Sequence, residues 1–191
     1  MKAHRLAPLF LLALCVALAA PAQAQINLFG GYYSNVARAA AANDAARVNE
    51  LVGTGSTPNE TDDNGYAGLH YAAMNGNLAM IAVLIKAGAR IDQRDRLGNT
   101  PLSLAAARGQ DEAAKLLIAA GANLNAQNRD GMTPLMIAAQ HGDLTLVRAL
   151  IAQGADAGKL DYTGHDAASW AADSHRPAVV AVIRRALAGA R

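Results

Sequence analysis

The side chains that could do chemistry are few and form no recognisable catalytic pattern. The 191 residues include five histidines and a single cysteine, Cys15. No HExxH motif, GxxxxGK phosphate loop or paired Cys/His spacing for a metal occurs. The glycine-rich residues 53–56 lack the strand, the lysine and the following helix of a phosphate loop, so they predict a plain turn. We therefore predict no catalytic residue, no metal ligand and no cofactor, and a protein that is not an enzyme.

The acidic residues instead fit turns that recur at a fixed step. Asp62, Asp95 and Asp161 each precede a glycine by three residues, a position where an Asp side chain hydrogen-bonds its own backbone. Two sets of glycines repeat every 33 residues: Gly65, Gly98, Gly131 and Gly164, and Gly88, Gly121 and Gly154. A fixed period of this length is the mark of a repeat array.

The best-preserved unit shows what each repeat contains. After the turn, Thr133 is a helix N-cap and Pro134 is preset for the first helical position. A short helix follows and ends at Gly142. A second helix over residues 144–153 carries apolar residues on one face and ends at Gly154. Neither helix is long enough to be stable alone, so the units must stack.

Three segments resemble the ankyrin repeat, whose signature is T-P-L-H-x-A at a period of 33 residues. They are TPLMIAA at 133–139, TPLSLAA at 100–106 and the degraded AGLHYAA at 67–73. A tetratricopeptide array would need another period. The resemblance implies an all-α solenoid of about five helix–turn–helix units with short β-turn fingers. We expect the units at residues 34–61, 62–94, 95–127, 128–160 and 161–191.

The terminal units depart from this pattern as capping repeats do. The first lacks the Asp-x-x-Gly turn and has Asn43 in register with the mid-unit glycines. In the last, residues 175–177 replace that glycine, and Arg184 stands where earlier units have isoleucine. The resemblance also implies that His70 ties adjacent turns by hydrogen bonds. We expect one row to be core between units: Tyr71, Leu104, Ile137 and Trp170.

Residues 1–24 predict a cleavable signal peptide. A basic start precedes an apolar run, which is short for a membrane span, and residues 22–24 form an A-x-A cleavage site. Residues 25–33 then form a linker into a repeat domain over 34–191. We expect the periplasm as the location and secretion as the second choice.

The charge of the processed chain argues against a nucleic-acid binder. The full chain has 17 basic and 15 acidic residues, a net charge of +2. The leader removes Lys2 and Arg5 and no acid, which leaves 15 against 15, or zero. A neutral domain lacks the broad positive field that nucleic acids require. We expect no nucleic acid or membrane as a partner of the processed protein, and a monomer.

The resemblance implies that turn tips and the exposed ends of first helices form a concave face that holds partners. The arginines there are flanked by Tyr and Met, types enriched at protein interfaces. We therefore expect another protein with an acidic and partly apolar surface as the partner. The candidate partner-binding residues are Tyr66, Arg94, Arg96, Arg108, Arg129, Met132, His141 and Tyr162.

The function expected is a non-catalytic interaction module, an exported adaptor that binds and stabilises or localises a partner protein. The alternative is a periplasmic inhibitor or immunity protein that neutralises a toxin or enzyme. Both would use the same face, so the sequence leaves the two open.

Overall fold

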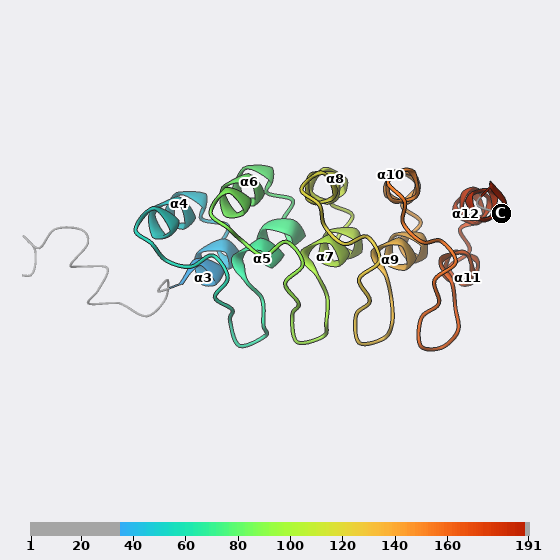
Figure 1. The fold of residues 1–191 in the computed structure, drawn as a ribbon, viewed down its shortest axis with the longest axis horizontal. Coiled ribbons are helices and arrows are strands. Elements are labelled where there is room, and N and C mark those ends of the chain that lie inside the picture. Colours follow the sequence, from blue (N-terminus) through green and yellow to red (C-terminus); the bar gives the residue numbers. More distant parts are fainter. Residues whose placement is uncertain (1–34, 190–191) are drawn as a thin grey trace, which may run out of the picture. The chain divides into compact units, whose positions relative to one another are not determined.

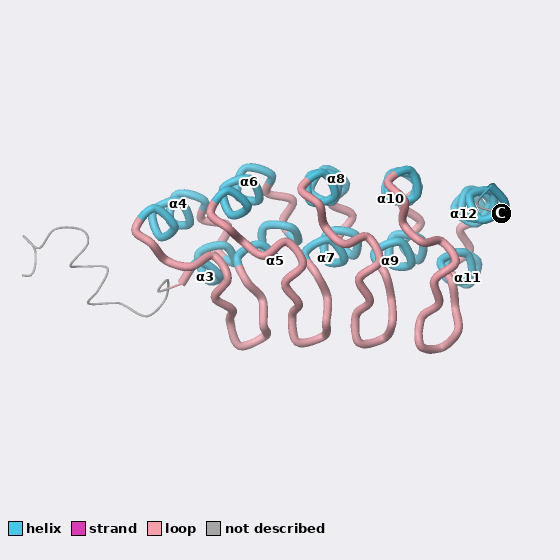
Figure 2. The backbone as a smooth tube through the Cα atoms, in the orientation of Figure 1, coloured by secondary structure: helices cyan, strands magenta, loops and turns pink. Residues whose placement is uncertain are grey.

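The computed structural model describes residues 35–189, which form ten helices in five consecutive pairs (Figure 1). The predicted signal peptide and linker lie outside these residues. The described part contains no strand, only an isolated bridge between Thr61 and Ala67 (Figure 2). The expected all-α array of five helix pairs is therefore confirmed for this part of the chain. The pairs are α3 (Val36–Ala41) and α4 (Ala45–Gly53), α5 (Gly68–Met74) and α6 (Leu78–Lys86), α7 (Pro101–Ala107) and α8 (Asp111–Ala119), α9 (Pro134–His141) and α10 (Leu144–Ala152), and α11 (Ala167–Asp173) and α12 (Pro177–Gly189).

The helices form two layers, and long loops project from one of them (Figure 1). The first helix of each pair, here the inner helix, packs on the inner helices of neighbouring units, and the second, or outer, helix does the same in its own layer. Four loops, here called fingers 1 to 4, project from the inner layer away from the outer helices (Figures 1 and 2). Fingers 1 to 4 comprise residues 61–67, 94–100, 127–133 and 160–166.

Local chemistry explains where the helices begin and end. In α9 the Thr133 hydroxyl accepts the Met136 amide, and Pro134 occupies the first turn. The helix stops at Gly142, whose φ of 79° is a left-handed conformation that glycine adopts without strain. The corresponding residues of the terminal units, Asn43 and His175, adopt positive φ without being glycine.

The core runs through the whole array and consists of small inner-helix residues and larger outer-helix ones. Leu84, Leu117, Leu150 and Ile183 occupy one register of the outer helices, and all are fully buried. The inner helices contribute mainly alanines, which let neighbouring helices approach closely.

The row that we expected to be core between units is only partly so. Leu104 and Ile137 are buried, as predicted. Tyr71 and Trp170 pack against the core but remain partly exposed, because their polar atoms reach finger carboxylates instead. Aromatic residues with a polar group commonly keep such a partner.

Candidate binding surface

Each finger is shaped by one Asp or Asn side chain at its base. Asp95 Oδ1 accepts the Leu97 amide at 2.8 Å and the Asn99 amide at 2.7 Å. The same pair of bonds, to the amides two and four residues on, forms in the other three fingers, at Asp62, Asn128 and Asp161. A finger is therefore closed by its own side chain before any partner arrives.

The carboxylates of fingers 1 and 4 also bind an inner-helix aromatic residue. Tyr71 donates its hydroxyl to Asp62, and Trp170 Nε1 donates to Asp161 at 2.9 Å. Burial works to raise the pKa of Asp161, but hydrogen bonds from His165, Thr163 and Trp170 outweigh it and lower the pKa to about 2. The Asp161 carboxylate is thus held ionised as a structural acceptor.

Backbone hydrogen bonds join each finger to the one before it. Arg96 N donates to Asn64 O at 3.2 Å, and Arg129 N donates to Leu97 O at 2.9 Å. Tyr162 N donates to Asp130 O at 3.3 Å. These three donors lie 33 residues apart, so one position of the repeat makes the connection every time.

Side chains at one position of the repeat also join neighbouring fingers by hydrogen bonds. Arg94 Nη1 donates to Gly98 O in its own finger and to Gln127 O in finger 3. Gln127 Nε2 repeats this pattern one unit on, donating to Gly131 O at 2.7 Å and to Leu160 O at 2.9 Å. Arg94, which we predicted to bind a partner, thus has a structural role at its guanidinium group.

A further ladder of hydrogen bonds joins the segments that lead into successive fingers, and sequence reasoning did not identify it. Asn59 Oδ1 accepts the Arg90 amide at 2.7 Å. One unit on, Asp92 Oδ1 accepts the Asn123 amide at 2.9 Å, and Asn125 repeats this bond with Asp156. The 33-residue step from 59 to 92 to 125 was the available signal.

The predicted site residues come from the fingers and from the ends of inner helices, and they fall into four registers. Arg94 has a register to itself. Arg96, Arg129 and Tyr162 share the second, and Tyr66 and Met132 share the third. Arg108 and His141 share the fourth, at the C-terminal ends of α7 and α9. We call the surface that these residues form, together with the exposed finger tips, the finger face.

The structure leaves several of these side chains available to a partner. Arg96 and Arg129 are exposed, and neither guanidinium has a hydrogen bond or ion pair among the described residues. Tyr162 is the most exposed large apolar residue of the described chain, at 72 %. His141 is also exposed, although its Nδ1 lies 2.9 Å from Ile137 O.

Tyr66 and Arg108 come from consecutive units and lie close enough to interact electrostatically. Burial raises the pKa of Tyr66, as do the carboxylates of Asp95 and Asp62, whereas the Arg108 charge opposes the rise. Tyr66 also packs edge-on against Tyr71, with ring centres 5.4 Å apart. The half-buried Tyr66 ring is therefore fixed in place, and the exposed Arg108 stands nearby.

Two exposed leucines complete the finger face. Leu97, at the tip of finger 2, is 58 % exposed, and Leu160, at the base of finger 4, is 54 % exposed. Leu160 was missed in the sequence because a leucine between turn residues carries no signal for which way its side chain points.

His70 is fully buried, and its role is more local than the resemblance implied. Its Nδ1 accepts the amide of Ala67 at 3.0 Å and so caps its own helix, while Nε2 has no well-formed hydrogen bond. Burial lowers the pKa of His70, although Asp95 and the nearby backbone of Gln93 and Asn99 oppose this. The ring faces the backbone of Gln93 and Asn99 at the base of the next finger, so the predicted tie is present as an electrostatic contact rather than as a well-formed hydrogen bond.

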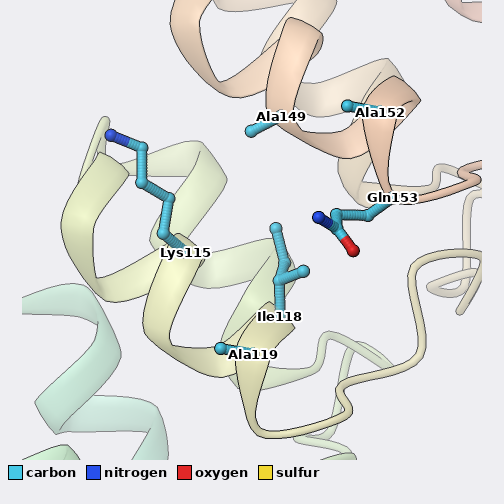
Figure 3. A pocket seen from close by; sticks show the side chains of 6 residues that line it. All are labelled: Lys115, Ile118, Ala119, Ala149, Ala152 and Gln153. Atoms are coloured by element: carbon cyan, nitrogen blue, oxygen red, sulfur yellow. The ribbon is translucent and has the colours of Figure 1, made fainter.

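The opposite side of the domain has a partly open groove between α8 and α10 (Figure 3). Its volume is about 350 Å³, and its lining is mostly hydrocarbon: Ile118, Ala119, Ala149 and Ala152, with Lys115 and Gln153. Lys115 Nζ is paired with Glu112 at 2.6 Å. The hydrogen bond with Glu112 raises the pKa of Lys115 and holds it protonated, and the other lining residues carry no nucleophilic or acid–base group.

Residues 35–189 contain neither a metal-binding cluster nor a membrane-spanning helix. No three His, Cys, Asp or Glu side chains lie together in a group that could hold a metal ion. None of the helices in this range has the length and apolar content needed to cross a bilayer.

Comparison with known proteins agrees with this architecture. The family described as ankyrin repeats (3 copies) matches residues 36–128 and, in a second overlapping match, residues 104–188. No curated protein matches the chain significantly. Ankyrin repeat domains generally bind proteins and are typically non-catalytic. With both the helix pairs and the family match covering most of its length, the chain belongs to the ankyrin repeat family.

Proposed function

We propose that this protein is an exported, non-catalytic adaptor whose finger face binds another protein and stabilises or localises it. The observation that carries the proposal is the pair of exposed guanidiniums, Arg96 and Arg129, on fingers whose backbones are already fixed. A partner with an acidic and partly apolar surface is complementary to these arginines, to the exposed Tyr162 and Leu97, and to the half-buried Met132.

Preorganisation of the fingers supports binding at this face. Asp95 closes finger 2, and the Arg129 amide joins finger 3 to it. A surface whose backbone is ordered beforehand loses little conformational entropy on association. Arg, Tyr and Met are also the residue types enriched at protein interfaces.

The compartment that we propose is the periplasm, with secretion as the second choice. The support is the leader pattern of residues 1–24, which predicts export. A protein that inhibits a toxin or enzyme would use the same finger face, so the identity of the captured partner distinguishes an adaptor from an inhibitor.

Affinity capture from the envelope fraction of the source cells tests the proposal. The wild-type protein should retain a partner that mass spectrometry identifies. Reversing both finger charges, Arg96→Glu with Arg129→Glu, should abolish capture. The matched control is Arg148→Glu with Arg184→Glu, which reverses two exposed charges on the outer helices α10 and α12 and should leave capture intact. Two results would reject the finger face as the binding surface. One is unchanged capture by the finger variant, and the other is an equal loss of capture in both double variants.

A further inference from the structure

One register of the fingers forms a regular line of side chains, here called the fingertip row. It contains Asp63, Arg96, Arg129 and Tyr162, one residue from each finger in order. The last three are the residues whose amides bond to the preceding finger. The row therefore repeats one backbone environment while its side chains change from acidic to basic to aromatic.

The side chains of Arg96 and Tyr162 begin against a glycine of the preceding finger. A Cβ built on Gly65 would lie 2.9 Å from Arg96 N and 3.3 Å from Arg96 Cγ. A Cβ on Gly131 would lie 2.6 Å from Tyr162 N and 2.9 Å from the Tyr162 ring. The glycines leave room for the next residue of the row, which fixes where its side chain starts. The Arg96 and Arg129 head groups remain without a partner among the described residues.

The step between neighbouring fingers matches one kind of protein segment. Packed helices lie about 8–10 Å apart, which sets the step between units. A polyproline II segment rises about 3.1 Å per residue with three residues per turn. Its side chains at i, i+3 and i+6 therefore point the same way at steps of about 9 Å. An α-helix rises 1.5 Å per residue, so it covers the same step in about six residues, and the nearest position on the same helix face is i+7.

We propose that the fingertip row recognises an extended segment of the partner protein in an acidic–acidic–apolar order. One carboxylate faces Arg96, a second faces Arg129 three residues along, and an apolar side chain three residues further faces Tyr162. This inference rests on the proposed function, because it gives the chemistry of the partner at the same face. Asp63, at the start of the row, excludes a third acid there and favours a basic residue.

The residues next to Arg96 and Arg129 indicate which arginine contributes more to binding the segment. Leu97 follows Arg96 at the tip of finger 2 and is 58 % exposed, so an acid there meets a cation beside an apolar surface. Arg129 is followed by the exposed Asp130, whose charge repels the second carboxylate. Arg96 is therefore the stronger anchor, and Asp130→Asn should improve binding.

Selection from a displayed library of random short peptides tests the inference on the purified protein. The enriched peptides should share two acidic residues at i and i+3 and an apolar residue at i+6, read in either chain direction. A synthetic peptide of that consensus should bind at least about tenfold more tightly than a version with the same composition in scrambled order, or one with the acids at i and i+4. Arg96→Glu should weaken binding more than Arg129→Glu does. Asp130→Asn should strengthen it about two- to threefold, a change of a few tenths of a kcal/mol, as for a screened surface pair.

Selection on the Arg96→Glu/Arg129→Glu variant should enrich basic residues instead of acids. Selection on the matched control, Arg148→Glu/Arg184→Glu, should return the wild-type consensus. The inference is overturned by no consensus, by a consensus without spaced acids, by acids at the helical i and i+7 spacing, or by an unchanged consensus on the finger variant. If envelope capture still depends on Arg96 and Arg129 in any of these cases, only the extended acidic pattern is wrong and the proposed function stands. Loss of that dependence would instead remove the proposed function itself.

Discussion

At the scale of single residues, the finger face depends on a few side chains that close or seat each loop. One Asp or Asn oxygen holds two amides in every finger, and one glycine leaves room for the finger that follows. The turns were predictable because Asp-x-x-Gly recurs at a fixed step. The hydrogen bond from Arg94 to finger 3 was not predictable. An arginine in a turn is usually solvated, and the sequence does not show that the Gln127 carbonyl of the next finger lies within reach.

The two roles of the finger glycine can be separated by comparing Gly131 with Gly164. Both adopt positive φ, +81° and +88°, but only a Cβ at Gly131 would collide with the next finger, since nothing lies within 4 Å of Gly164. Gly164→Ala should lower the free energy of unfolding by about 1–2 kcal/mol, the cost of left-handed backbone. Gly131→Ala should cost about 1–3 kcal/mol more, as overpacking does. Chemical denaturation measures both, and equal losses would show that Gly131 does not seat Tyr162.

The Asp161 carboxylate predicts acid sensitivity in the last finger. Its pKa is about 2 in the folded protein against 3.8 ordinarily, so the unfolded chain takes up the proton first as the pH falls. Its contribution to stability is therefore full above about pH 4 and is lost progressively towards pH 2. Asp161→Asn keeps the oxygen that Asn128 uses in finger 3 but has no charge to titrate.

Melting temperatures of the wild-type protein and Asp161→Asn should differ at pH 5 and converge as the pH approaches 2. Parallel curves over this range would contradict the assignment.

Asp111 affects stability over a higher pH range than Asp161 and with the opposite sign, because its hydrogen bond with Asp143 raises its pKa to about 6. There the folded protein holds the proton more tightly, so stability falls as pH rises from about 4 to 6.

At the scale of helices, the capping chemistry of each unit was largely readable from the sequence. Thr-Pro predicted the starts of α7 and α9, and the structure confirms both caps. The partial exposure of Tyr71 and Trp170 was harder to predict. Helical periodicity does not show that a finger carboxylate lies within hydrogen-bonding distance of each side chain.

Helix α5 is an inner helix whose start can be improved. Its N-cap is Ala67, which offers no side-chain hydrogen bond, whereas α7 and α9 begin at Thr100 and Thr133. Ala67→Thr should raise the free energy of unfolding by about 1 kcal/mol, since the Thr hydroxyl would accept the His70 amide, which here bonds only the Ala67 carbonyl at 3.0 Å. Denaturation of Ala67→Val, which has the same shape without the hydroxyl, controls for packing. A Thr variant no more stable than the Val variant would contradict this explanation.

At the scale of the whole domain, the finger face exists only because units stack. Each unit contributes one side chain to each register, and no unit alone presents the pair Arg96 and Arg129. The period of 33 residues was sufficient to predict which side chains share a row. It could not predict which of them remain free, because that depends on bonds between neighbouring fingers. Binding a partner through this face is the central claim of the account.

Hydroxyl-radical footprinting of the complex with the captured partner tests that claim most directly. Tyr162 and Leu97 are exposed on the fingers, and Leu78, 42 % exposed at the start of the outer helix α6, is an internal reference. The account predicts that the partner protects Tyr162 and Leu97 from oxidation and leaves the labelling of Leu78 unchanged. Protection of Leu78 with undiminished labelling of Tyr162 and Leu97 would place the partner on the outer helices and contradict the account.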